Sequence, residues 1–125
     1  MTKKTKIACP LESEEGVALM SWAAYHPIAK YYLFHISNEN KTSWQNGRSL
    51  KAQGKKKGVS DYLLAYPSNE KHGLFIELKR RVRSLSKLSE DQAIFLAQQT
   101  RVGYAAFVAY GSDEAIDIIK KYFGE

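Results

Sequence analysis

Two acidic residues and one lysine lie where a short β-hairpin would bring them together. An Ile-Glu-Leu-Lys run at 76–79 places Glu77 and Lys79 two positions apart in an apolar segment. Because side chains alternate along a strand, both charged groups should share one face of a sheet. Folding the chain about Asn69 brings Asp61, eight residues earlier, opposite Glu77, eight residues later. The sequence therefore predicts that two carboxylates face each other across adjoining strands.

Such a pair of carboxylates suits metal chemistry. Directly opposed side chains have Cβ atoms about 5 Å apart, and two carboxylates at that distance repel unless a proton or a cation lies between them. Oxygen ligands favour a hard ion such as Mg²⁺, which lowers the pKa of bound water and neutralises charge on a phosphate. Lys79 could orient the nucleophile or stabilise the anion. The alternative, an ordinary surface pair of Glu77 and Lys79 with Asp61 ending a turn, stays open at this point.

The elements that must position these residues are read from periodicity, caps and turn residues. Ser13 is expected to cap a largely buried helix that ends before Pro27, and Ser89 and Ser112 to cap two later helices. The hairpin is expected at 59–79, with its turn at 67–73. In chain order we expect a helix to residue 24, a strand at 31–36, a loop at 37–46, a short helix at 48–53, strands at 59–66 and 74–79, a helix from 89 that Gly103 ends, a strand at 104–110 and a last helix. This order predicts one α/β domain with a mixed central sheet flanked by helices.

Length and composition narrow the class of protein. A chain of 125 residues with 44% hydrophobic and 26% charged residues fits one domain, expected at 11–125 after a basic tail at 1–10. It has no apolar stretch of the roughly 18 residues that cross a bilayer and no signal-like start, so we expect a cytoplasmic protein. With Cys9 as its only cysteine, an intrachain disulfide and a conventional zinc site are not expected.

The net charge of +6 is concentrated in the middle of the chain. Residues 41–87 carry twelve basic side chains against three acidic ones, a local net charge of +9, whereas residues 88–125 carry three against six. The basic residues gather at 55–57 and 79–83. This distribution favours a polyanionic partner, although lysine-rich loops are also common on solvated surfaces.

Four segments in order resemble the VRR-NUC domain, the virus-type replication-repair nuclease branch of the PD-(D/E)xK superfamily. They are Gly-Val-Ser-Asp at 58–61, Ile-Glu-Leu-Lys at 76–79, Leu-Ser-Glu-Asp-Gln at 88–92 and Gly-Tyr-Ala-Ala-Phe-Val-Ala at 103–109. The resemblance covers nearly the whole chain and implies the αβββαβ core of that superfamily, which agrees with the element order above. It also implies a metal-dependent DNA endonuclease.

The resemblance assigns roles to individual residues. Asp61 and Glu77 match the family's metal-binding carboxylates, and the main-chain carbonyl of Leu78 would be a further ligand. Lys79 matches the catalytic lysine. Gln92 matches a glutamine beside the site, where it would steady the lysine or a phosphate. The position before Asp61, often proline in the family, is serine here, which concerns the rigidity of the turn only.

A glutamate from the first helix is also implied, and three residues compete for that role. We expect Glu14 to be the metal-binding and catalytic glutamate, because it stands three residues before Val17, where the apolar helix begins. Glu15 is the alternative, and Glu12 the third candidate. For all three, a favourable interaction with the helix dipole is an ordinary explanation.

The basic residues around the site are expected to contact DNA phosphates, which fixes position without reading bases. A P-loop and a Gly-x-Gly-x-x-Gly fingerprint are absent from the sequence, so no nucleotide cofactor is expected. Trp22, Trp44, His26, His35 and His72 are assigned to packing or surface. The expected DNA contacts are Lys51, Lys55, Lys56, Lys57, Arg80, Arg81 and Arg83.

The combined expectation is a Mg²⁺- or Mn²⁺-dependent, structure-selective endonuclease of phage or prophage type. The resemblance implies a homodimer, in a bacterial or phage-infected host cell, and two symmetric sites would suit a branched substrate such as a Holliday junction. Two alternatives remain: a non-catalytic DNA-binding module in which the acidic pair is structural, and a flap or nicking nuclease within a replication complex.

Overall fold

The computed structural model describes residues 8–37 and 44–125, so most of the expected basic tail and residues 38–43 of the expected loop lie outside the described residues. The described chain forms five α-helices, four strands and one 3-10 turn. They are α1 (Glu12–Ala23), α2 (Ala29–Tyr32), β1 (Leu33–His35), α3 (Trp44–Ala52), β2 (Tyr62–Leu64), β3 (Leu74–Lys79), η1 (Arg83–Leu85), α4 (Glu90–Arg101), β4 (Ala105–Tyr110) and α5 (Ser112–Phe123).

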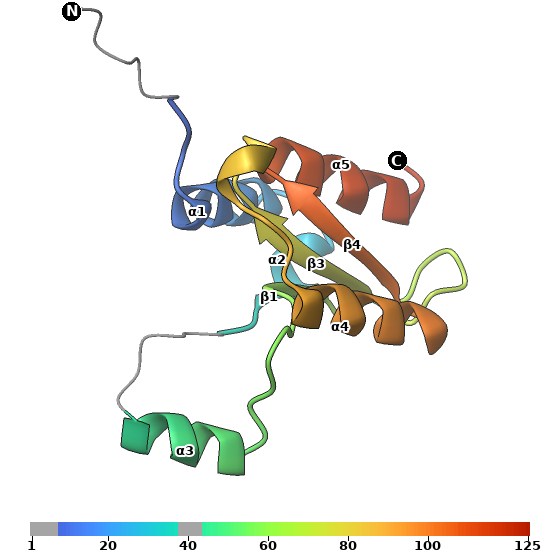
Figure 1. The fold of residues 1–125 in the computed structure, drawn as a ribbon. Helices are drawn as coiled ribbons and strands as arrows, with labels where there is room; N and C mark the ends of the chain where they lie inside the picture. The colour runs from blue at the N-terminus through green and yellow to red at the C-terminus, as the bar shows by residue number, and fades with distance from the viewer. Residues whose placement is uncertain (1–7, 38–43) are drawn as a thin grey trace, which may run out of the picture.

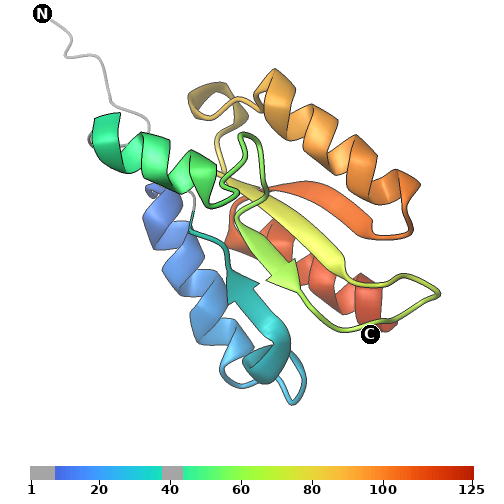
Figure 2. The same ribbon diagram turned by 90° about the horizontal axis from the view of Figure 1, so that it is seen from below.

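A four-stranded sheet in the order β1-β2-β3-β4 forms the centre of the domain. The first three strands are antiparallel, whereas β4 runs parallel to β3. Parallel neighbours need a crossover, and α4 supplies it. In Figure 1, α1 and α5 cover one side of the sheet and α4 lies on the other, and Figure 2 shows the same layers from below. The sheet is therefore mixed and covered by helices on both sides, as expected.

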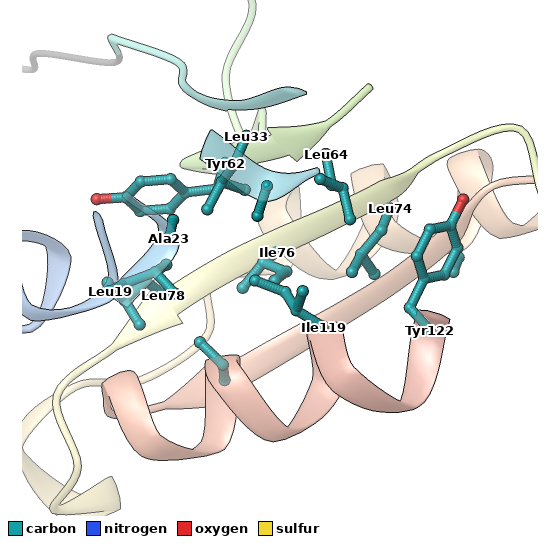
Figure 3. Close-up of a cluster of buried hydrophobic side chains, with 14 residues drawn as sticks. Leu19, Ala23, Leu33, Tyr62, Leu64, Leu74, Ile76, Leu78, Ile119 and Tyr122 are labelled. Carbon is teal, nitrogen blue, oxygen red and sulfur yellow. The ribbon is translucent and has the colours of Figure 1, made fainter. Parts of the chain in front are cut away.

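The hydrophobic core lies between the sheet and the pair α1 and α5. Leu19 of α1, Leu74 and Ile76 of β3 and Ile119 of α5 are almost completely buried and meet there (Figure 3). Burying each such side chain is worth about 1.5–3 kcal/mol. On the opposite face of β3, Phe75 packs edge-on against Phe95 of α4, with ring centroids 5.1 Å apart. Alternate residues of β3 therefore face different helices, as the strand period requires.

The β2–β3 hairpin contains a one-residue offset between its turn and its strands. Asn69 and Glu70 both have positive φ, 50° and 61°, at the centre of a turn closed by a bridge between Ser68 and Lys71. Leu64 pairs with Leu74, and Ser68 pairs with Lys71. Three residues lie between Leu64 and Ser68, whereas only two lie between Lys71 and Leu74, so the first side of the hairpin has one extra residue. The extra residue sets which side chains of β2 face those of β3, because a shift of one residue reverses the faces of a strand.

Several sequence-based elements have different limits in the structure. The strand expected at 31–36 is β1 at Leu33–His35, preceded by α2, and the strand expected at 59–66 is only Tyr62–Leu64. Residues 44–46, expected in a loop, begin α3. Ser112 is the first residue of α5, which follows Gly111, and does not cap it. In contrast, β3 and the Ser89 cap of α4 agree with the prediction.

The expected burial of the first helix is wrong. Only four residues of α1 are buried, and Val17, on its other face, is 68% exposed. The helix also begins one residue before Ser13, after Leu11. Small and apolar residues in this segment indicated burial, but only one stripe of the helix contacts the sheet and α5.

Candidate active site

The register of the hairpin places Asp61 opposite Glu77. Tyr62, the first residue of β2, pairs with Ile76, so Asp61, directly before β2, stands across from Glu77 of β3. The Oδ2 atom of Asp61 accepts the backbone N–H of Leu78 at 2.8 Å, and its main-chain oxygen accepts the N–H of Ile36 from the β1 side. Asp61 is therefore fixed between β1 and β3 by one side-chain bond and one main-chain bond.

Glu77 is a buried carboxylate with one satisfied oxygen and one free oxygen. Its Oε1 accepts a hydrogen bond of 2.7 Å from the side-chain amide of Gln92, and Nζ of Lys79 lies 3.6 Å from the same atom. Its Oε2 is buried and has no hydrogen-bond partner. A buried acceptor without a partner costs about 1–3 kcal/mol, and more when the group is charged. Glu77 is thus incompletely satisfied by the protein alone.

The pKa shifts of Asp61 and Glu77 also indicate that the protein alone does not satisfy this carboxylate pair. Burial, followed by repulsion from Asp61, raises the pKa of Glu77 to about 8, even though Lys79 acts in the opposite direction. Burial also raises the pKa of Asp61, against the effects of the Leu78 N–H and of Lys79. A proton on Glu77 allows a hydrogen bond to Asp61. The two carboxylates therefore require a shared proton or a cation, because one nearby lysine does not balance them.

The structure brings Glu12 toward the carboxylate pair and turns Glu14 away from it. Repulsion from Asp61 contributes to the raised pKa of Glu12, after its burial. The exposed side chain of Glu14 accepts the backbone N–H of Leu11 at 2.9 Å. Our choice of Glu14 for a position at the site therefore does not agree with the geometry: at the start of α1 this side chain folds back to close the first turn.

Glu15, the alternative choice, is buried on another side of α1. Arg81 donates two short hydrogen bonds to its carboxylate, at 2.7 and 2.6 Å, and the hydroxyl of Ser112 donates a third. The hydrogen bond from Arg81 is the main cause of the lowered pKa of Glu15. This glutamate joins α1 to the start of α5 and does not reach Asp61.

A cavity of about 220 Å³ opens beside Asp61. Glu12, His35, Asp61 and the side of Leu78 line it, together with Ser13 and Tyr62. The ring of His35 is tilted against that of Tyr62, with centroids 5.1 Å apart, and the electrostatic interaction with His35 is one of the lesser causes that oppose the raised pKa of Asp61. The sequence predicts packing or surface for His35, whereas the structure places it at this cavity. Its place became evident only from the pairing of β1 with β2, for which no local sequence signal exists.

The three arginines after β3 have partners within the protein. Arg80 donates to the main-chain oxygens of Pro10 and Cys9, and so holds the segment before α1. Arg81 is paired with Glu15. Arg83 lies over the ring of Tyr110 and 3.6 Å from a carboxylate oxygen of Glu114. These internal bonds compete with the expected contacts to DNA phosphates, above all at Arg81.

The four lysines expected to contact DNA lie on the segment that leads to Asp61. Lys51 is in the last turn of α3, and Lys56 and Lys57 are exposed, whereas Lys55 is partly buried. Gly58, which follows them, lies directly against the backbone of Asp91 in the first turn of α4. The lysine segment is therefore attached next to the helix start that carries Gln92.

The donor set can be tested for its fit to a divalent cation. Within residues 8–37 and 44–125, no three His, Cys, Asp or Glu side chains form a cluster ready to hold a metal ion. The set consists of two carboxylates and the main-chain oxygen of Leu78. Mg²⁺ commonly uses one or two carboxylates with waters and substrate phosphates. The unpartnered Oε2 of Glu77 supplies an oxygen of the required kind, so the residues fit the ion.

Two of three comparisons relate the chain to known proteins. The sequence model of the VRR-NUC domain matches residues 16–113. A solved structure described as a VRR_NUC domain protein has a TM-score of 0.81 and 24% sequence identity, and the match covers 94% of this chain and 92% of that chain. No curated protein matches the sequence. The structural likeness confirms the expected fold.

The family match also gives the general activity, a nuclease-type domain that processes DNA. Separately, none of the helices in the described part of the chain has the length and apolar character needed to span a membrane. The match extends from α1, through the hairpin and α4, to the first turn of α5, and so contains the carboxylate pair, Lys79 and Gln92. The chain therefore belongs to the VRR-NUC domain family.

Proposed function

We propose that this protein is a Mg²⁺- or Mn²⁺-dependent endonuclease that hydrolyses phosphodiester bonds in DNA. The observation that carries the proposal is the free, buried Oε2 of Glu77 opposite Asp61, with the Lys79 ammonium 3.6 Å from the other oxygen of the same carboxylate. A structural ion pair would satisfy both oxygens, whereas this arrangement retains an anionic ligand at the point where two strands meet.

Asp61, Glu77 and the main-chain oxygen of Leu78 would hold the cation, with Glu12 near enough to add negative charge. When bound, a divalent ion supplies a lower pKa for water and neutralises charge on the phosphate. Gln92 fixes the rotamer of Glu77 through Oε1, which leaves Oε2 for the ion. The Leu78 N–H holds Asp61 in the same way through Oδ2. Both ligands are thus oriented before substrate arrives.

Lys79 has the position of a positively charged donor at the reacting phosphate. Its side chain is only 9% exposed and is held by Glu77, so its ammonium group needs little reorganisation to stabilise developing negative charge. Attack of water in line with the leaving 3′ oxygen would break the P–O3′ bond and leave a 5′ phosphate. The open cavity lined by Glu12 and His35 gives one side of the site access to solvent.

We extend the proposal to a homodimer that acts on branched DNA such as a Holliday junction. Two opposed strands of a junction need two sites, which a symmetric dimer would provide. An open groove of about 600 Å³ lies along α1, and Val17 and Met20 form part of its lining. The outer side of this helix therefore has an apolar surface. Its exposure was not expected from the sequence and is compatible with contact to a second copy.

The test is cleavage of flap, fork, four-way junction and linear duplex substrates with Mn²⁺ or Mg²⁺, together with the mass of the protein in solution. We expect cleavage that EDTA abolishes and that Lys79→Ala reduces by about 10²- to 10³-fold, with DNA affinity retained. Binding without cleavage of any substrate would favour the alternative of a non-catalytic DNA-binding module. Cleavage of flaps or nicked duplex alone would favour the flap nuclease.

A further inference from the structure

A cavity of about 330 Å³, named here the tip cavity, lies between the hairpin turn at Asn69 and Lys71, the first half of β4 and the last turns of α5. Figure 1 shows these three segments at the same end of the molecule. Ala105, which lines the cavity, pairs with Leu74 and belongs to the core on the α5 side of the sheet. Glu77, three residues after Leu74, faces α4 instead, because alternate residues of a strand face opposite sides. The tip cavity is therefore separate from the candidate active site.

Two hydrogen bonds between the hairpin and α5 hold the walls of the tip cavity. The hydroxyl of Tyr122 donates to the main-chain oxygen of Tyr66 at 2.6 Å, and the hydroxyl of Ser68 donates to the main-chain oxygen of Tyr122 at 2.8 Å. Both bonds join the residues before the turn to the end of α5. The cavity is thus largely preformed, and a ligand would have to order little of the protein on binding.

The lining of the tip cavity is mainly apolar and partly aromatic. Phe107 of β4 is 51% exposed, although Ala105 and Ala109, its neighbours on the same face of the strand, are buried. Ile118 and Tyr122 of α5 complete the apolar part of the lining. An exposed aromatic ring beside a cavity offers a surface on which a flat ligand can stack.

Two lysines add positive charge to this apolar lining. Lys71 follows the turn and Lys121 is in the last turn of α5, and both are exposed. Within residues 8–37 and 44–125, neither lysine forms an ion pair. The acidic residues closest to them in sequence, Glu70, Asp117 and Glu125, do not line the cavity. Two ammonium groups beside a stacking surface fit a ligand in which a flat ring is attached to an anion such as a phosphate.

We propose that the tip cavity binds a nucleotide, with the nucleobase stacked on Phe107 and the phosphate between Lys71 and Lys121. Its volume is at the lower end of the range for small-molecule sites. The family processes DNA, which brings the chain into contact with nucleotides. The proposal goes beyond the proposed nuclease activity, because it uses none of the residues around Glu77. A free mononucleotide and a single-stranded segment of DNA both contain the recognised group.

The first measurement is a titration with dAMP in EDTA, followed through the amide signals of the protein in NMR spectra. We expect saturable binding with a Kd near or below about 1 mM, and the largest shifts at residues 105–107 and 118–122. Deoxyadenosine, which lacks the phosphate, and inorganic phosphate, which lacks the ring, should each bind at least about tenfold more weakly. Shifts centred on Asp61 and Glu77, or no saturation below about 10 mM dAMP, would overturn the proposal.

The second measurement compares two neighbouring lysines of α5. Lys121→Gln should raise the Kd for dAMP about three- to tenfold and reduce its dependence on salt. Lys120→Gln is the matched control, because it removes the same charge from an exposed residue that does not line the cavity, and it should keep the wild-type Kd. Equal effects of the two substitutions would refute the proposal, since they would indicate only the general charge of the protein.

The third measurement tests stacking at Phe107. Phe107→Ala should raise the Kd for dAMP about tenfold, whereas Phe107→Trp should retain binding because it keeps an aromatic surface. Thermal unfolding of both variants should resemble that of the wild type, since this side chain is half-exposed. Unchanged affinity in a folded Phe107→Ala protein would contradict the stacked position of the base.

A short oligodeoxyadenylate distinguishes the two sources of the nucleotide. Tighter binding than that of dAMP, lost on Phe107→Ala, would assign the tip cavity to a strand of DNA, whereas equal affinity would assign it to a free nucleotide. These results do not depend on cleavage. A protein that cuts DNA but does not bind dAMP would refute this inference alone, and one that binds dAMP but cuts nothing would refute only the nuclease activity.

Discussion

The side-chain amide of Gln92 donates to Oε1 of Glu77 at 2.7 Å, while the side-chain oxygen of Gln92 accepts the backbone N–H of Ser89 at 2.9 Å. One residue therefore both caps α4 and orients a carboxylate of the candidate site. The backbone N–H of Gln92 in turn donates to the hydroxyl of Ser89, which completes a capping box. The start of this helix and the position of Glu77 are consequently set by the same side chain.

Replacing Gln92 with Ala should reduce the cleavage rate by about 10- to 100-fold, because Glu77 loses the bond that fixes its rotamer. Ser89→Ala is the matched control: it removes the cap and costs about 1 kcal/mol of stability, but leaves the Gln92 amide in place. Rates at saturating DNA and thermal unfolding would be measured for both variants. Equal loss of activity in the two would show that the cap, rather than the contact to Glu77, matters.

The stability of the metal-free protein should fall as pH rises through the range of Glu77. Its pKa is raised in the folded protein, from 4.5 to about 8, so the folded state binds the proton more tightly than the unfolded state. This contribution to stability is complete below pH 4.5 and is lost as pH rises toward 8. Thermal unfolding in EDTA between pH 5 and 9 measures it.

One variant and the addition of a metal ion sharpen that measurement. Glu77→Gln should remove most of the decline in stability between pH 5 and 9, because the side chain no longer ionises. Mg²⁺ or Mn²⁺ should raise the wild-type melting temperature more at pH 8 than at pH 5, since the cation competes with the proton, and should not raise that of the variant. A wild-type protein whose stability is flat over this range would contradict the electrostatic interpretation of the site.

Substitutions of the three glutamates at the start of α1 should have different effects on cleavage rate and stability. Glu12→Gln should lower the cleavage rate without loss of stability, because Glu12 lies near Asp61 and is relieved of repulsion when neutral. Glu14→Gln should leave the rate unchanged. Glu15→Ala should cost about 2–4 kcal/mol of stability, since it removes the partner of Arg81 at a buried position. Denaturant unfolding and single-turnover cleavage distinguish these outcomes.

Ser60 offers a test of an unsatisfied buried group. Its side chain is fully buried, and its hydroxyl oxygen has no hydrogen-bond partner. Ser60→Ala removes that hydroxyl at almost constant volume and should be neutral or stabilise the protein by up to about 1–2 kcal/mol. Activity should persist, because Asp61 keeps its bond to Leu78. A clear loss of stability in chemical denaturation would show that the hydroxyl has a partner, such as an ordered water.

The carboxylate pair could be predicted from the sequence because it depends on a hairpin whose strands have a simple period. The positions of Asp61, Glu77 and Lys79 follow from alternation and from one turn. Gln92 was found through a resemblance, although the Ser89 cap already indicated the helix start. The sequence did not indicate that Glu12, rather than Glu14 or Glu15, lies near Asp61, because successive residues of a helix differ in direction by about 100° and the sequence does not show which side meets the sheet.

Other errors arose where long-range contacts override local patterns. Tyr31 and Tyr32 have high strand propensity, yet Tyr32 ends a short helix before β1. His35 reaches the site only because β1 pairs with β2, although a connection of more than twenty residues that contains α3 separates the two strands in sequence. The arginines after β3 were expected to face DNA, but Glu15 holds Arg81, and neither partner indicates the other in the sequence.

Because of the extra residue between Leu64 and Ser68, the turn of the hairpin determines which residue stands opposite Glu77 at the far end of β3. If the strands paired symmetrically from the bridge between Ser68 and Lys71 with every residue retained, Tyr62 and not Asp61 would stand across from Glu77, and the anionic pair would be lost. Deleting one residue from 65–67 would instead remove the offset and leave Asp61 opposite Glu77. Although surface loops generally accept changes in length, a change at this tip should retain the site only where the strands still pair Asp61 with Glu77, with or without a bulge.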